Sequence, residues 1–84
     1  MPYIKDTERK KFAYALLSMP KIETKGELEY IVFSLMMKYR NSKEERYSHL
    51  HDCTYAVQHC ADEFRRRFLD KREDEAREIN GDII

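Results

Sequence analysis

The sequence predicts an all-α protein, a three-helix antiparallel bundle with a long C-terminal helix that associates with further copies of itself. Apolar residues recur at helical spacing in three segments, at about residues 6–19, 24–40 and 48–79. The middle segment is apolar on nearly every side, and the last is unusually long for so short a chain. Because 84 residues suffice for one domain, we assign residues 1–84 to a single helical domain.

The first helix is predicted by a short apolar stripe between a capping signal and a proline. Asp6 or Thr7 can cap its start, because their side-chain oxygens accept from free backbone N–H groups. Pro20 ends it, since the residue before a proline is disfavoured in a helix. The stripe consists of Phe12, Ala13, Leu16 and Leu17.

The second helix carries the strongest signal in the chain. Thr24 and Glu27 have the spacing of a capping box, and we expect Gly26 to permit close approach of another backbone. One apolar face contains Leu28, Ile31, Val32, Leu35, Met36 and Tyr39, and a second contains Tyr30, Phe33 and Met37. A helix that is apolar all round is buried all round. We therefore predict that Tyr30, Phe33 and Met37 form the interface of a homo-oligomer, a dimer or larger.

The third helix is predicted to begin at Ser48, with Ser42 and its capping-box pattern Ser-Lys-Glu-Glu as an alternative earlier start. It is predicted to stop at Asn80-Gly81, a typical helix end. Its apolar seam has heptad-like steps of three and four residues through Leu50, Cys53, Val57, Cys60, Phe64 and Phe68. A helix of about 30 residues is about 45 Å long. Its polar end is therefore expected to project or to lie against a partner. The apolar ends, Tyr3-Ile4 and Ile83-Ile84, are expected to dock against protein rather than remain in water.

Charge and cysteine content limit the partners. The 16 basic residues are matched by 16 acidic ones, whereas nucleic-acid binders usually show a basic excess, so we do not expect a nucleic-acid partner.

Cys53 and Cys60 are about 10 Å apart on one helix, too far for a disulfide, and free thiols suit a reducing cytosol. No segment resembles a signal peptide or a membrane span of about 20 apolar residues. We expect a cytoplasmic protein with no membrane partner.

Catalytic and metal-binding motifs are weak in this sequence. We identify no nucleophile–base pair and no glycine-rich phosphate loop, and we predict no catalytic residue, no cofactor and no enzymatic activity. His49 and Cys53 share a helix face at i,i+4, but a structural zinc site usually takes four ligands. We predict no metal site within one chain, which leaves open a metal held between copies or by carboxylates.

The run Arg65-Arg66-Arg67 is the candidate anion-binding segment. Guanidinium groups bind phosphate in a bidentate manner, and tyrosines stack on bases. We therefore name Arg66, Arg67, Tyr3 and Tyr30 as candidate ligand-binding residues. The competing interpretation is that the arginines form ion pairs along an exposed helix, since three acidic residues, Asp62, Glu63 and Asp70, lie within helical reach.

Several short motifs together suggest a family. They are Met1–Lys5 (Met-Pro-Tyr-Ile-Lys), Gly26–Tyr30 (Gly-Glu-Leu-Glu-Tyr), Glu63–Arg67 (Glu-Phe-Arg-Arg-Arg), Glu73-Asp74 and Asn80–Asp82 (Asn-Gly-Asp). With these motifs the chain resembles an uncharacterised family of small phage and bacterial proteins that begin Met-Pro-Tyr-Ile and end Asn-Gly-Asp plus two apolar or aromatic residues. The chain departs from the family in its first helix and in its last residue, which is Ile84 rather than an aromatic.

The resemblance implies a short phage or bacterial accessory protein in the cytoplasm of a bacterial host. A phage protein of this size is expected to act by stoichiometric binding without catalysis. One expected ligand is an anionic small molecule, such as a nucleotide signal of host defence, which the protein would sequester. The alternative is an interaction module that inhibits or scaffolds a host protein.

Overall fold

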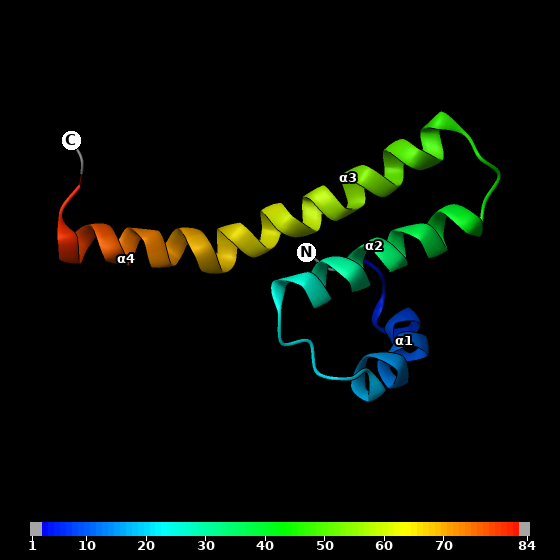
Figure 1. The fold of residues 1–84 in the computed structure, drawn as a ribbon, viewed down its shortest axis with the longest axis horizontal. Helices are drawn as coiled ribbons and strands as arrows, with labels where there is room; N and C mark the ends of the chain where they lie inside the picture. The colour runs from blue at the N-terminus through cyan, green and yellow to red at the C-terminus, as the bar shows by residue number, and fades with distance from the viewer. Residues whose placement is uncertain (1–2, 83–84) are drawn as a thin grey trace. The chain divides into compact units, whose positions relative to one another are not determined.

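The computed structural model describes residues 3–82, and every regular element among them is helical (Figure 1). Helix α1 spans Asp6–Ser18 and α2 spans Lys25–Asn41. Helix α3, Tyr47–Phe64, continues without a break through the π-helical turn η1, Arg65–Leu69, into α4, Asp70–Asn80. The predictions of an all-α protein, three helices and a long last helix are confirmed.

The chain divides into two compact units, residues 1–31 and residues 32–84, with the boundary inside α2. The first unit holds α1 and the beginning of α2. The second holds the rest of α2 together with α3, η1 and α4. The assignment of residues 1–84 to one domain stays a prediction, as does antiparallel packing of the three helices.

In the first unit, α1 begins without the predicted side-chain cap. Lys5 occupies the capping position, and its carbonyl oxygen accepts from the N–H groups of Glu8 and Arg9 at 2.9 and 3.1 Å. Asp6 is already helical and forms an ion pair with Arg9 at 2.9 Å. The prediction that Asp6 or Thr7 caps this helix is therefore wrong. The proline stop is confirmed, because Met19, just before Pro20, has extended backbone angles.

The capping box at the start of α2 forms as predicted. The N–H of Glu27 donates to Thr24 Oγ1 at 3.0 Å, and the N–H of Thr24 donates to Glu27 Oε1 at 2.9 Å. Glu23 N–H donates to the same oxygen at 2.8 Å. Gly26 does not serve a close approach among the described residues, because an added Cβ would meet only Thr24 Oγ1, at 4.0 Å.

In the second unit, α3 begins one residue before the predicted Ser48 cap. Arg46 occupies the capping position without a side-chain hydrogen bond. His49 Nδ1 lies 2.8 Å from the carbonyl oxygen of Glu44 and so closes the loop of residues 42–46. At the other end, Gly81 N–H donates to the Arg77 carbonyl at 2.8 Å, and its φ of 84° is strained for residues other than glycine.

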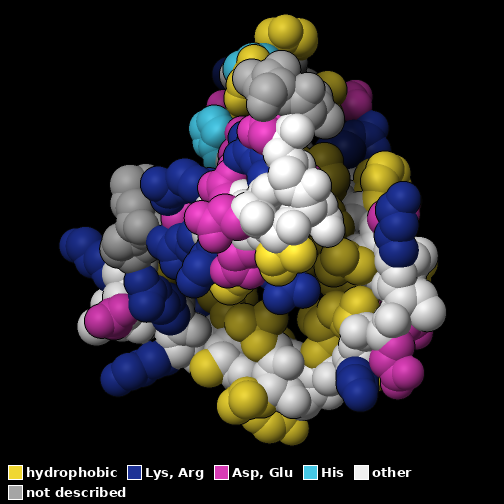
Figure 2. Space-filling view, turned by 90° about the vertical axis from the view of Figure 1, so that its left-hand side faces the viewer, with side chains coloured by type: hydrophobic (Ala, Val, Ile, Leu, Met, Phe, Trp, Pro, Cys, Tyr) yellow, Lys and Arg dark blue, Asp and Glu magenta, His cyan; other side chains and the backbone are white. Residues whose placement is uncertain are grey.

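No residue of the described range 3–82 is buried. Large apolar side chains on every helix keep much of their surface in solvent, with Leu17 of α1 87% exposed and Phe64 of α3 65% exposed. Figure 2 shows hydrophobic side chains at the surface among the charged ones. This part of the chain therefore forms helices without enclosing a hydrophobic core.

The capping box yields a test of local helix stability. Thr24→Ala removes one of its two reciprocal bonds and is expected to destabilise the protein by about 1 kcal/mol, a typical cost of losing an N-cap. In a domain this small that amounts to about 4–8 °C in melting temperature. Thr24→Ser, which keeps the hydroxyl, should melt like the wild type. An unchanged melting temperature in Thr24→Ala would contradict the role of the box.

The box also has a pH signature. Backbone hydrogen bonds, first from Glu23 and then from Thr24, lower the pKa of Glu27 because they favour its carboxylate. The Glu27 carboxylate therefore contributes fully to folding stability above the ordinary glutamate pKa. This contribution is lost as the pH falls through the lower pKa of the folded state. Glu27→Gln keeps an acceptor but cannot titrate, so its stability should fall less than the wild type's on acidification.

Candidate functional site

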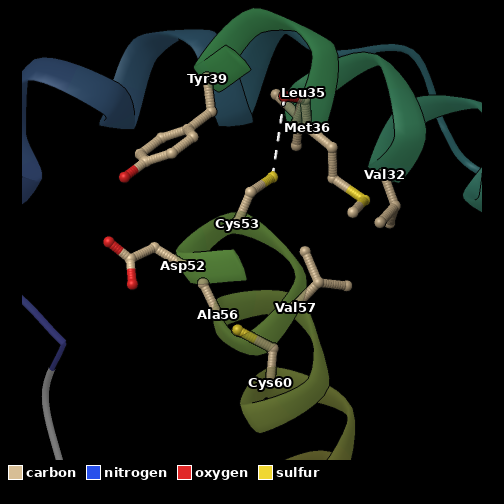
Figure 3. A pocket seen from close by; sticks show the side chains of 9 residues that line it. All are labelled: Val32, Leu35, Met36, Tyr39, Asp52, Cys53, Ala56, Val57 and Cys60. Atoms are coloured by element: carbon tan, nitrogen blue, oxygen red, sulfur yellow. Dashed lines mark hydrogen bonds between the residues drawn. The ribbon is translucent and has the colours of Figure 1, made fainter. Parts of the chain in front are cut away.

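The second unit contains an open apolar groove between α2 and α3, with a volume of about 470 Å³ (Figure 3). Four lining residues, Val32, Leu35, Met36 and Tyr39, come from α2, and five, Asp52, Cys53, Ala56, Val57 and Cys60, come from α3. On each helix every lining residue has another one three or four positions away, which places these residues on one side of the helix. We call this hollow the α2–α3 groove.

The α2–α3 groove is lined almost entirely by apolar side chains. Cys53 is half-buried, and its Sγ points to the carbonyl oxygen of Met36 at 3.8 Å, a weak hydrogen bond. Neither Cys53 nor Cys60 forms a disulfide. The one charged residue among the nine that line the groove is Asp52, which lies at the same end as Tyr39 (Figure 3). The groove thus offers apolar area with a single carboxylate at one end.

The opposite face of α3 carries a ladder of aromatic rings that we did not predict. Centroid distances are 5.8 Å from Tyr47 to His51, 4.3 Å from His51 to Tyr55 and 5.9 Å from Tyr55 to His59. The i,i+4 spacing was visible in the sequence as a repeat of tyrosine and histidine. Two of these distances lie within the range of about 4.5–7 Å typical of aromatic pairs, and the contact between His51 and Tyr55 is slightly closer.

The arginine run is held by its own carboxylates. Glu63 accepts from Arg66 at 2.5 Å and from Arg67 at 2.6 Å, and Arg65 lies 3.6 Å from Asp62 and 4.0 Å from Asp70. The hydrogen bond from Arg66, followed by that from Arg67, lowers the pKa of Glu63. An anion that binds Arg66 and Arg67 would therefore have to compete with a carboxylate that already binds both.

The other candidate ligand-binding residues lie in the first unit. Tyr3 is exposed, and Tyr30, 71% exposed, lines a hollow of about 370 Å³ with the segment 19–22 and the first turn of α2. Since Arg66 and Arg67 belong to the second unit, a ligand site made of all four residues stays a prediction. Of the apolar ends that we expected to dock, Ile83 and Ile84 lie outside the described residues, whereas Tyr3 and Ile4 are 62% and 38% exposed.

On the predicted oligomer interface, Phe33 is 64% exposed and Met37 is half-buried. Within residues 3–82, no group of three or more histidine, cysteine or acidic residues has a geometry that could hold a metal ion. The helices of this range include none that is both long and apolar enough to cross a membrane.

Comparison with known proteins gives one match. A family model described as "Domain of unknown function (DUF6899)" matches residues 1–83. No curated protein and no solved structure matches the chain.

Proposed function

Because this chain belongs to the DUF6899 family, a domain of unknown function, we propose its function from its surfaces: it is a non-enzymatic protein that acts by stoichiometric binding as an assembly of identical copies. The observation that carries this proposal is the lack of any buried residue among residues 3–82. Burial of apolar area is the dominant favourable contribution to folding, and small domains commonly obtain what they lack by oligomerisation.

Exposed apolar residues on all three helices favour an assembly of copies over a monomer. Soluble monomers rarely expose large contiguous apolar patches, and such patches mark interaction sites. Here the exposed large residues include Phe12 and Leu17 on α1, Phe33 on α2, and Phe64 on α3. In the proposed assembly these helices pack antiparallel to one another and to helices of neighbouring copies, and the core forms between chains.

The second face of α2 is the first contact that we propose. Tyr30, Phe33 and Met37 follow one another at steps of three and four residues, so they form a single stripe. The α2 residues of the groove, Val32 and Met36, lie on another side of the same helix. A partner bound to the stripe of Tyr30, Phe33 and Met37 would therefore leave the α2–α3 groove open.

The sequence analysis named two possible partners other than a second copy. They are a nucleotide signal of host defence and a host protein. The paired arginines favour the protein, because a phosphate would have to compete with the Glu63 carboxylate that already binds both Arg66 and Arg67. The apolar face of α2 and the α2–α3 groove also suit a helical protein partner, because an amphipathic helix binds in an apolar groove. A phage or bacterial origin and a cytoplasmic location in the host complete the proposal, on the strength of the sequence resemblance.

Phe33→Asp tests the α2 contact. We expect light scattering to give wild-type particles with a multiple of the 10.2 kDa chain mass, and smaller particles for the variant, because an unpaired carboxylate is costly in a dry contact. Tyr14→Asp is the matched control, since Tyr14 is an exposed aromatic outside this stripe. A wild-type mass of one chain would contradict the proposal, and an unchanged mass in Phe33→Asp would exclude this face.

A thermal-shift panel of mono-, di- and cyclic nucleotides separates the two other partners. We expect no rise in the wild-type melting temperature, because both arginines are engaged. A ligand present at 100 times its dissociation constant would instead add about 2.7 kcal/mol of stability. Such a shift, if Arg66→Ala abolished it, would favour the nucleotide over the host protein. Glu63→Gln, which weakens the hold on both arginines, serves as a variant sensitised to anions.

A further inference from the structure

We propose that the α2–α3 groove receives the aromatic pair Phe64 and Phe68 of a second copy, whose own groove receives the pair of the first copy in return. This inference rests on the proposed self-association and deepens it by naming a second contact, the residues that fill it and its symmetry.

The groove and the aromatic pair lie on one continuous stripe of the long helix. Cys53, Val57 and Cys60 line the groove, and the same seam continues to Phe64 and Phe68 beyond the last lining residue. The two phenyl rings are in tilted contact, with centroids 4.9 Å apart and an interplanar angle of 47°, and the two residues are 65% and 57% exposed. An exposed aromatic pair thus directly adjoins an empty apolar groove.

The π-helical turn keeps Phe68 on this stripe. The seam advances by 3, 4, 3 and 4 residues from Leu50 to Phe64 and then by four again to Phe68, one residue more than the heptad pattern. In η1 the N–H of Asp70 donates to the carbonyl of Arg65, an i→i+5 bond. This looser turn accommodates one added residue and so returns Phe68 to the seam. Single π-helical turns are frequent at functional sites.

A stripe with a hollow at one end and a projecting pair at the other is complementary to itself under two-fold rotation. If two such helices lie antiparallel, Phe64 of one copy faces Val57 of the other and Phe68 faces Cys53, and the axis passes beside Cys60. Aromatic side chains bury about 150–250 Å² each. The four phenylalanines of two copies thus supply much of the roughly 1,000 Å² that a specific interface requires.

The charges around the two features are also complementary. Asp52 is the carboxylate at the groove, and Arg65, Arg66 and Arg67 lie between Phe64 and Phe68 in the sequence. Arg65 is held least closely by its own acids, at 3.6 and 4.0 Å. Insertion of the aromatic pair brings a guanidinium group towards Asp52 of the other copy. This favours a second copy as the occupant over a purely apolar ligand.

Cysteine crosslinking tests the geometry. In the Cys53→Ala variant, Cys60 is the sole thiol of the chain, and a short bis-maleimide should join two copies through it because it lies next to the axis. Phe64→Ser and Phe68→Ser should each abolish the crosslinked dimer while circular dichroism confirms that they remain helical. Phe33→Asp, which acts on the other contact, should leave it in place.

The control moves the thiol along the helix. In Cys53→Ala/Cys60→Ala/Glu78→Cys, the introduced thiol lies about 26 Å from the axis at 1.5 Å per residue, so two copies should not crosslink. A crosslink at position 78 but none at Cys60 would overturn the antiparallel arrangement. An oligomer by light scattering without a Cys60 crosslink would overturn the groove contact and leave self-association standing. A single-chain mass would overturn both.

Discussion

The transfer of apolar side chains out of water is the interaction on which the rest of this structure depends. The helices expose Phe, Leu, Ile and Tyr side chains on several faces, and none of the described residues is buried. Even when fully compact, a chain of this length buries a smaller fraction of its unfolded surface than a larger domain does. In the proposed assembly the missing burial comes from contacts between chains, through the exposed stripe of α2 and the α2–α3 groove.

The helices themselves are specified by local interactions. A capping box starts α2, a proline follows α1, and Gly81 ends α4 in a conformation that other residues avoid. Ion pairs one turn apart, such as those of Glu63 with Arg66 and Arg67, support the helices further. Exposed pairs of this kind contribute little to stability. Local order is thus secured within each helix, whereas tertiary order depends on contacts between helices.

This division explains which features the sequence could predict. The capping box, the proline stop and the Glu63 ion pairs depend on residues within four positions of one another, so their spacing is readable. The π-helical turn at Arg65–Leu69 has no comparable signal, since both it and an uninterrupted α-helix fit the same residues. The groove was missed as a site because it depends on how closely α2 and α3 approach. The four-residue ligand site joins residues of two units, and spacing along the chain says nothing about that placement.

The most direct test of this account is the dependence of unfolding on protein concentration. If the core forms between chains, association stabilises the folded state by mass action, and the chemical or thermal midpoint should rise steadily as the chain concentration increases from micromolar to millimolar. The helical signal and the particle mass should be lost together on dilution. A midpoint that stays constant over this range, with a helical particle of single-chain mass throughout, would contradict the account.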